Sequence, residues 1–371
     1  MLSFWEQDAM LAADLIVIGG GLIGLQTALE YQARRPNDTI KVLERGLLPS
    51  GASSRNAGFA CFGSITEIIH DIDAIGLDAT LSLVQRRRDG LVRMRRRLGD
   101  DTIGFEHAGG FELLMDSGLA ALERLDEVNH ALHPLFDADV FTVDEGGLKA
   151  GGFGPRAKAL IRNPFEGQLH AGKMMRTLAK LAGEQGIEIH TGINVDNLEP
   201  DRDLVRIRTR SGMVFEAGRV AVCTNALAAD LLPDSGIVPG RGQVLLTEAV
   251  PGLPWRGAHH VEQGFYYFRN VGDRVLLGGG RHLDFAGETT SELMPTTAIQ
   301  SALEQLLHEV ILPGRNACIT HRWAGIMGFS TSKQPIVRRI AERIVLGFGC
   351  NGMGVALGAD IAAETAGLLL E

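Results

Sequence analysis

The sequence predicts an α/β fold, α+β overall, in which a Rossmann-like domain with a parallel sheet is joined to a second domain with a mainly antiparallel sheet. A strand, a glycine turn and a helix follow one another near the N-terminus, which favours the first domain. Strand-like segments recur between residues 243 and 281 without long helices between them, which favours the second. The length of 371 residues agrees with two domains of about 150 residues or somewhat more.

The first domain begins with an apolar, β-branched run at 15–18, a glycine turn at 19–24 and a helix over 22–31. A short strand at 40–43 completes a βαβ unit, whose right-handed crossover makes the two strands parallel. Later segments predict a return to this sheet, with a helix at 168–185 and strands at 187–190, 204–209 and 220–223.

The second domain is predicted from strands at 244–247, 265–269 and 275–277. Residues 64–98 have a mostly helical pattern, and residues 99–116 are strand-like and punctuated by glycine. Two further helices are expected at 297–310 and 355–370.

Composition and charge exclude several classes of protein. Hydrophobic residues make up 45% of the chain and the net charge is −9, so the protein is expected to be globular and not to bind nucleic acid. The apolar run at 15–25 is interrupted by glycines and is too short for a membrane span, so none is expected. Residues 1–13 lack the basic start of a secretory signal, which favours a cytoplasmic location.

The cysteines and histidines show no metal-ligand spacing. Four cysteines lie far apart without a C-x-x-C pair, and eleven histidines form no ligand pattern. We therefore expect no metal site and a reducing compartment. The segment 86–97 holds seven arginines and one aspartate, and a solvated helix face paired with acids is expected there, with anionic lipid or nucleic acid as the alternative.

A dinucleotide-binding fingerprint follows the first strand. Gly19, Gly21 and Gly24 match G-x-G-x-x-G, and Glu44 comes 20 residues after the last of them. The first glycine permits a tight turn, the second lets the backbone approach a pyrophosphate, and the third allows the helix to pack closely on the strand. The Glu44 carboxylate can accept hydrogen bonds from a ribose. This motif alone leaves NAD and FAD open.

A polar, glycine-rich segment at 51–59 stands where a plain NAD domain would continue to its next helix. It resembles the second flavin-contacting segment of the D-amino-acid oxidase-like family of FAD-dependent oxidoreductases, which includes glycine oxidase, sarcosine oxidase and γ-glutamylputrescine oxidase. The glycine loop at 347–354, followed by an apolar helix, resembles the terminal loop of that family under the flavin. Segments at 192–195 and 220–226 extend the similarity over nearly the whole chain.

The resemblance implies a set of residues in contact with FAD, which is expected to be bound non-covalently. The set is Gly19, Gly21, Leu22, Ile23, Gly24, Glu44, Arg45, Ser53, Ser54, Arg55, Asn56, Ala57, Gly58, Phe59, Val195, Thr224, Asn225, Gly349, Asn351, Gly352, Met353 and Gly354. By the same resemblance, FAD-binding stretches at 1–85, 161–240 and 321–371 alternate with substrate-domain stretches at 86–160 and 241–320.

The resemblance also implies an activity. A C–N bond of a small amine or amino acid would be oxidised by hydride transfer to flavin N5, and the imine would then hydrolyse in water. Oxygen or another acceptor would reoxidise the flavin. Two alternatives stay open, namely oxidation of a 2-hydroxy acid and a non-catalytic flavin-fold subunit of a larger dehydrogenase. A homo-oligomer is compatible with the sequence.

A substrate carboxylate would need a fixed cation, and the planar fork of arginine binds both of its oxygens. Arg322 stands where relatives carry their substrate-binding arginine, and Arg269 is a rival for this role. Tyr267 is expected to face the substrate, because strand alternation turns Tyr266 to the other side.

Overall fold

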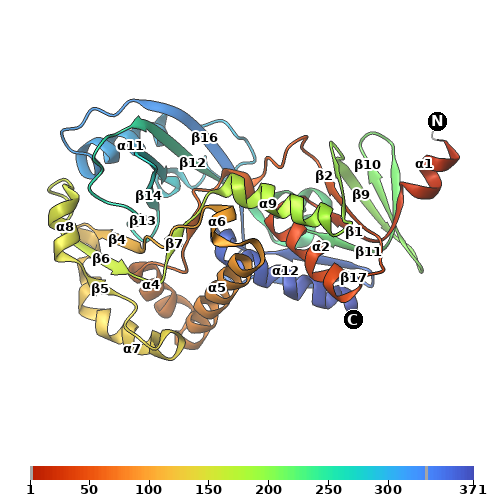
Figure 1. Cartoon of the computed structure of the whole chain (residues 1–371), viewed down its shortest axis with the longest axis horizontal. Coiled ribbons are helices and arrows are strands. Elements are labelled where there is room, and N and C mark those ends of the chain that lie inside the picture. Colours follow the sequence, from red (N-terminus) through yellow and green to blue (C-terminus); the bar gives the residue numbers. More distant parts are fainter. Residues whose placement is uncertain (1–2, 331–332) are drawn as a thin grey trace.

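The structure, a computed structural model, describes residues 3–330 and 333–371 and contains two large β-sheets. Figure 1 shows them in two lobes along the long axis of the molecule, with both ends of the chain on the lobe of the first sheet. The chain passes between the lobes several times, so separate stretches of sequence build each lobe. The predicted fold class is confirmed.

The first sheet has the strand order β17-β18-β11-β1-β2-β8, with β9 and β10 joined to β11. The strands from β18 to β8 run parallel to their neighbours, while β17, β10 and β9 add antiparallel pairs. Their bounds are β1 Ala12–Ile18, β2 Ile40–Glu44, β8 Glu188–Thr191, β9 Val195–Pro200, β10 Val205–Thr209, β11 Val214–Val222, β17 Ile336–Ala341 and β18 Ile344–Phe348.

Both faces of this sheet are buried at β1. Alternate residues of a strand point to opposite faces, and both sets of β1 side chains lie in hydrophobic clusters. Leu15 and Val17 lie in a core cluster with residues of the helices α2, α5, α9 and α12. Figure 1 shows these four helices gathered near the first sheet. Ile16 and Ile18 lie in another cluster, with residues of β10 and β11. A strand buried on both faces is apolar without interruption, which explains why the sequence predicted it.

The second sheet has the order β16-β12-β15-β14-β13-β4-β6-β5 and is antiparallel except between β13 and β4. One of its faces packs on helix α11, in a cluster that includes Leu245, Phe268 and Leu303. The bounds are β4 Gly110–Leu114, β5 Thr142–Val143, β6 Ala159–Asn163, β12 Val238–Ala249, β13 Ala258–Val261, β14 Tyr266–Val271, β15 Arg274–Gly279 and β16 Ile319–Phe329.

The helices include the long elements that the sequence pattern predicted. A short two-stranded sheet, β3 Phe59–Ala60 with β7 Gly167–Gln168, lies apart from the large sheets. The α-helices are α1 Phe4–Ala9, α2 Leu22–Arg34, α3 Ala52–Arg55, α4 Ile65–Ile75, α5 Leu77–Leu98, α6 Asp100–Ile103, α7 Leu125–Phe136, α8 Glu145–Gly151, α9 Ala171–Glu184, α10 Ala228–Leu231, α11 Thr297–Leu306 and α12 Gly354–Leu370. None of the helices in the described ranges is long and apolar enough to cross a membrane.

Two expected boundaries between the FAD-binding and substrate stretches fall inside strands of the second sheet. The boundary at 160/161 cuts β6, and the boundary at 320/321 cuts β16, which pairs with β12 along most of its length. The second sheet therefore keeps residues up to 163 and up to 329.

Candidate active site

The glycine turn after β1 is tight enough to require its glycines. Gly19 has φ +106°, and a Cβ atom there would lie 2.6 Å from the carbonyl oxygen of Cys223. A Cβ atom on Gly24 would overlap the carbonyl oxygen of Gly19. The turn therefore brings the start of α2 directly over the ends of β1 and β11, as the fingerprint predicts.

The N-terminus of α2 has no side-chain cap of its own, because its N-cap residue is Gly21. The Leu22 N–H donates to Ser53 Oγ at 2.9 Å, and the Gly20 N–H donates to Glu44 Oε2 at 2.9 Å. Ser53 and Glu44, predicted from separate motifs, thus meet at one helix end. The positive end of the helix dipole makes this position suited to a pyrophosphate.

The segment at 51–59 is held to β16 of the second lobe by hydrogen bonds from side chains to main-chain carbonyls. Arg55 Nη1 donates to the carbonyl of Ala324 at 3.0 Å, and Trp323 Nε1 donates to the carbonyl of Arg55 at 2.9 Å. Asn56 Oδ1 accepts from the Gly58 N–H at 2.8 Å, which fixes the turn that leads to Phe59. The segment therefore lies between the two sheets, where a ring bound to the first lobe would face the second.

Two predicted asparagines tie the end of β16 to the first lobe. Asn225, with φ +53°, donates from Nδ2 to the Ile326 carbonyl at 3.0 Å and accepts from the Gly328 N–H at 3.1 Å. Asn351 Oδ1 accepts from the Ser330 N–H at 2.9 Å. These bonds bring the loops after β11 and β18 to the same side of the first sheet as the glycine turn.

The residues present fit a bound FAD. Neither N-cap residue, Gly21 of α2 or Met353 of α12, caps its helix with its own side chain in the described structure, and the two helices pack against each other. Thr224 Oγ1 is buried and finds no hydrogen-bond partner among the described residues. Gly352, with φ +91°, has only Met327 Sδ at 3.9 Å from an added Cβ, so the loop offers room for a ligand. These donors and this space occur where the predicted set converges.

Two further predicted cofactor residues, Arg45 and Val195, come after the ends of β2 and β8. Arg45 is exposed after β2. Val195 begins β9 and pairs with Thr209, while the nearby Ile193 N–H donates to the Glu44 carbonyl at 2.9 Å. Their roles toward FAD stay predictions.

The strand β14 turns Tyr267 and Arg269 to the face opposite α11. Its alternate residues Tyr266 and Phe268 join the core with α11, so Tyr267 and Arg269 point to the other side. The Tyr267 ring lies edge-on to Phe59 with 5.5 Å between centroids, and burial raises the pKa of its hydroxyl to about 12. The tyrosine stays neutral and contacts the segment that we predict to run beside the flavin.

Arg269 is a buried cation that lacks a full set of partners. Its Nη2 donates to the Leu169 carbonyl at 3.0 Å, and its Nε finds no partner in residues 3–330 or 333–371. A Cβ atom on Gly58 would lie 3.0 Å from Nη2, so the guanidinium lies against the predicted flavin segment. Burial lowers the pKa of Arg269 to about 10, and the group still carries its charge at neutral pH.

Arg322 is not brought together with these residues. Its register partner in β12 is Leu245, whose side chain lies in the core under α11, and it donates to Gln300 at 2.7 Å and Glu304 at 2.9 Å. The next residue, Trp323, contacts the flavin segment from the other face. The strand register therefore gives Arg322 an ion pair with Glu304 on the face opposite Tyr267 and Arg269, which favours Arg269 over Arg322 as a candidate for the substrate clamp.

The arginine-rich segment lies on α5 and is largely paired. Arg86 contacts Asp360 at 2.6 Å, Arg95 contacts Asp100 at 2.7 Å, and Arg87 contacts Glu67 at 3.1 Å. These contacts agree with the expected helix face paired with acids.

Sequence reasoning missed a buried cluster next to Phe59. Ligand atoms of Cys61, Glu166 and His260 all lie within 4.8 Å of one another, and all three residues are buried. Burial raises the pKa of Glu166 to about 7 and lowers that of His260 to about 4. The expectation of no metal site rested on spacing along the chain, and these three residues come together only through the fold.

The fold and the site define a two-lobed protein with a glycine-rich turn of the dinucleotide-binding type after its first strand. The chain matches the family of FAD dependent oxidoreductases of D-amino-acid oxidase type over residues 14–368, and it belongs to that family. The predicted family is therefore confirmed, and the chain is an FAD-dependent oxidoreductase.

Individual relatives agree with this assignment. The chain is 28% identical to a probable oxidoreductase OrdL of Rhizobium meliloti (strain 1021), over 93% of this chain and 80% of that protein. It is 24% identical to the L-2-hydroxyglutarate dehydrogenase of Escherichia coli (strain K12), over 79% of this chain and 72% of that protein. The crystal structure of glycine oxidase from Geobacillus kaustophilus superimposes with a TM-score of 0.78 at 20% identity, covering 97% of this chain and 95% of that one, which shows a shared fold.

The first prediction concerns the glycine turn. We expect Gly21→Val to lower FAD affinity at least about tenfold, since its Cβ would lie 3.0 Å from Ser53 Oγ and its methyl groups would fill the approach to the pyrophosphate. FAD content and affinity of the purified variant measure this. Gly183→Val, at an exposed helical glycine with open space around it, is the control. Equal FAD affinity in both variants would remove the turn from the binding site.

Proposed function

We propose that the protein oxidises a C–N bond in a small amine or amino acid that carries a carboxylate, with non-covalent FAD as the electron acceptor. The single observation that carries this proposal is Arg269, a buried cation beside the segment at 51–59 whose Nε has no partner among the residues that the structure describes. Its guanidinium would hold the carboxylate through charge-assisted hydrogen bonds. The glycine oxidase fold supports the choice of an amine.

The other residues of this face would orient the substrate and exclude water. Tyr267, Phe59 and Trp323 belong to one apolar cluster around Ala57, and they would form the wall against which a small substrate lies. When bound, FAD would accept the two electrons of the oxidation. The N-terminus of α12 would stabilise negative charge that develops on the reduced ring.

The experiment that tests this function is an anaerobic panel. Purified holoenzyme is mixed with small amines, D- and L-amino acids and 2-hydroxy acids, and the loss of the visible flavin absorbance is followed. We expect rapid bleaching by one group of amino acids or amines bearing a carboxylate. Bleaching by amines without a carboxylate would contradict the role of Arg269.

The second candidate function is oxidation of a 2-hydroxy acid. The similarity to the L-2-hydroxyglutarate dehydrogenase favours it, and Arg269 would bind its carboxylate in the same way. Bleaching by hydroxy acids alone would select this function. Absence of bleaching throughout the panel would favour a flavin-fold subunit that does not itself turn over.

A further prediction concerns how the flavin is held. We expect acid precipitation to release all of the FAD into the supernatant. Cys61 is buried and its pKa is raised by burial, so its thiol is a poor nucleophile for covalent attachment. Absorbance spectra of the supernatant and the washed pellet measure the split, and a yellow pellet would show a covalent bond.

A further inference from the structure

The buried cluster of Cys61, Glu166 and His260 joins three parts of the chain. Cys61 follows β3, Glu166 precedes β7, and His260 lies in β13, so the pairing of β3 with β7 brings the first two together. The exposed fractions of the three residues are 1%, 1% and 7%. Their ligand atoms, a thiol sulfur, a carboxylate oxygen and an imidazole nitrogen, all lie within 4.8 Å of one another.

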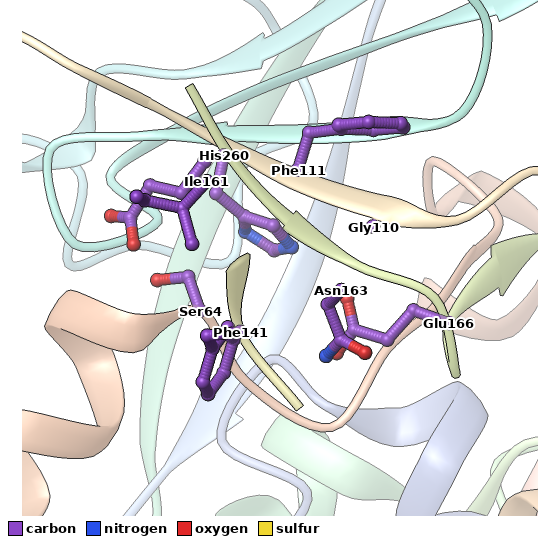
Figure 2. Close-up of a pocket in the computed structure, with 9 residues that line it drawn as sticks. Ser64, Gly110, Phe111, Phe141, Ile161, Asn163, Glu166 and His260 are labelled. Carbon is purple, nitrogen blue, oxygen red and sulfur yellow. The ribbon is translucent and has the colours of Figure 1, made fainter. Parts of the chain in front are cut away.

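His260 has a nitrogen that the described protein residues leave without a partner. Its Nε2 is buried and accepts or donates no hydrogen bond within residues 3–330 and 333–371. Figure 2 shows the His260 ring pointing into a small pocket, between Ser64 on one side and Asn163 and Glu166 on the other. A buried, unpaired ring nitrogen is costly unless a ligand completes it.

Glu166 is oriented as a ligand would be. Its Oε1 accepts the N–H groups of Phe62 at 2.7 Å and Gly63 at 3.2 Å. Outer hydrogen bonds of this kind fix the direction of a metal-binding carboxylate.

We propose that Cys61, Glu166 and His260 bind one Zn²⁺ ion in a site separate from the FAD. A thiolate, a carboxylate and a neutral imidazole form a donor set that zinc accepts, while Mg²⁺ and Ca²⁺ prefer oxygen ligands alone. The charges also agree, because one thiolate and one carboxylate balance a divalent ion in a buried place.

Three protein ligands leave a fourth position for an exchangeable ligand. The pocket beside His260 and Glu166 has a volume of about 10 Å³, which suits one water-sized molecule. Asn163 Nδ2 lines this pocket without a partner of its own among the described residues and can donate to that ligand. The His260 ring also packs against Phe59 at 5.2 Å between centroids, so the ion would lie behind the wall of the proposed substrate site.

The test measures metal and not turnover, so it is independent of the proposed function. The holoenzyme is produced with zinc sulfate in the growth medium, passed through a chelating resin, and assayed for zinc by elemental analysis. We expect about one equivalent per chain. X-ray absorption at the zinc edge should show one sulfur at about 2.3 Å and nitrogen or oxygen neighbours at about 2.0 Å.

Variants assign the ligands. Cys61→Ser and Glu166→Gln should each weaken zinc binding at least about tenfold, and Cys61→Ser should remove the sulfur neighbour from any residual signal. Cys318→Ser, at an exposed cysteine outside the cluster, is the matched control and should keep a full equivalent.

Two outcomes would overturn the proposal. Wild-type holoenzyme that retains FAD but holds less than about a tenth of an equivalent of zinc would show that the site does not bind the ion. Zinc without a sulfur neighbour would place it elsewhere. If a variant fails to fold, the sulfur signal of the wild-type protein still decides the question.

Discussion

Arg269→Leu is expected to lower kcat/KM for the best carboxylate substrate by about two orders of magnitude or more. Each hydrogen bond to a charged group contributes about 1.5 to 3 kcal/mol, so two such bonds to the carboxylate contribute about 3 kcal/mol or more. A hundredfold change in kcat/KM corresponds to about 2.8 kcal/mol. The Leu169 carbonyl also loses its donor at 3.0 Å, so some stability is lost as well. Stopped-flow reduction of the flavin, with FAD content measured in parallel, separates the two effects.

Two further variants make this result specific. Arg269→Lys should recover little, because an ammonium group cannot reproduce the guanidinium fork. Arg322→Leu should leave kcat/KM nearly normal, since Arg322 is paired with Glu304 and Gln300 under α11. If Arg322→Leu loses turnover while Arg269→Leu keeps it, the substrate clamp is Arg322, and our reading of β16 is wrong.

The nucleotide turn was predictable because its determinants are local. Gly19 and Gly24 meet within one turn, and their lack of Cβ atoms is required by contacts with Cys223 and with each other. Glu44 stands at the end of the next strand, where the parallel register brings it to the same helix end. Sequence spacing therefore specifies this part of the site.

The orientation of Arg322 was not predictable from sequence. The residues His321, Arg322 and Trp323 show no alternation of apolar and polar side chains that would tell one face from the other. The register with β12 decides, because Arg322 lies opposite Leu245 under α11 and Trp323 lies opposite Val244 on the other face.

The cluster of Cys61, Glu166 and His260 is a property of the tertiary fold. Consecutive members are about a hundred residues apart in the sequence, and none belongs to a short motif. The contacts depend on β3 pairing with β7 and on the place of β13 beside β4 in the second sheet. The one signal in the sequence was the position of Cys61 directly after the flavin segment.

Glu288→Gln is expected to lower the free energy of unfolding by about 3 to 5 kcal/mol, because it leaves a buried arginine without its charge partner. Arg241 and Glu288 are 4% and 1% exposed. They form two hydrogen bonds, Nε to Oε2 at 2.9 Å and Nη2 to Oε1 at 2.7 Å. Gln243 Nε2 donates to both carboxylate oxygens of Glu288 at 3.0 Å, so both oxygens accept hydrogen bonds from residues of β12.

Urea unfolding of the FAD-loaded variants measures this loss, and Glu304→Gln supplies the comparison. The partner of Glu304 is Arg322, and the side chains are 39% exposed for Glu304 and 35% exposed for Arg322. Because water screens such an exposed pair, Glu304→Gln should cost less than about 1 kcal/mol. The paired replacement of Arg241 by Met and Glu288 by Leu should restore much of the stability, since it removes the buried charge together with its partner. Equal losses for Glu288→Gln and Glu304→Gln would mean that water reaches the Arg241 guanidinium and that the buried ion pair does not hold β12 to the loop after β15.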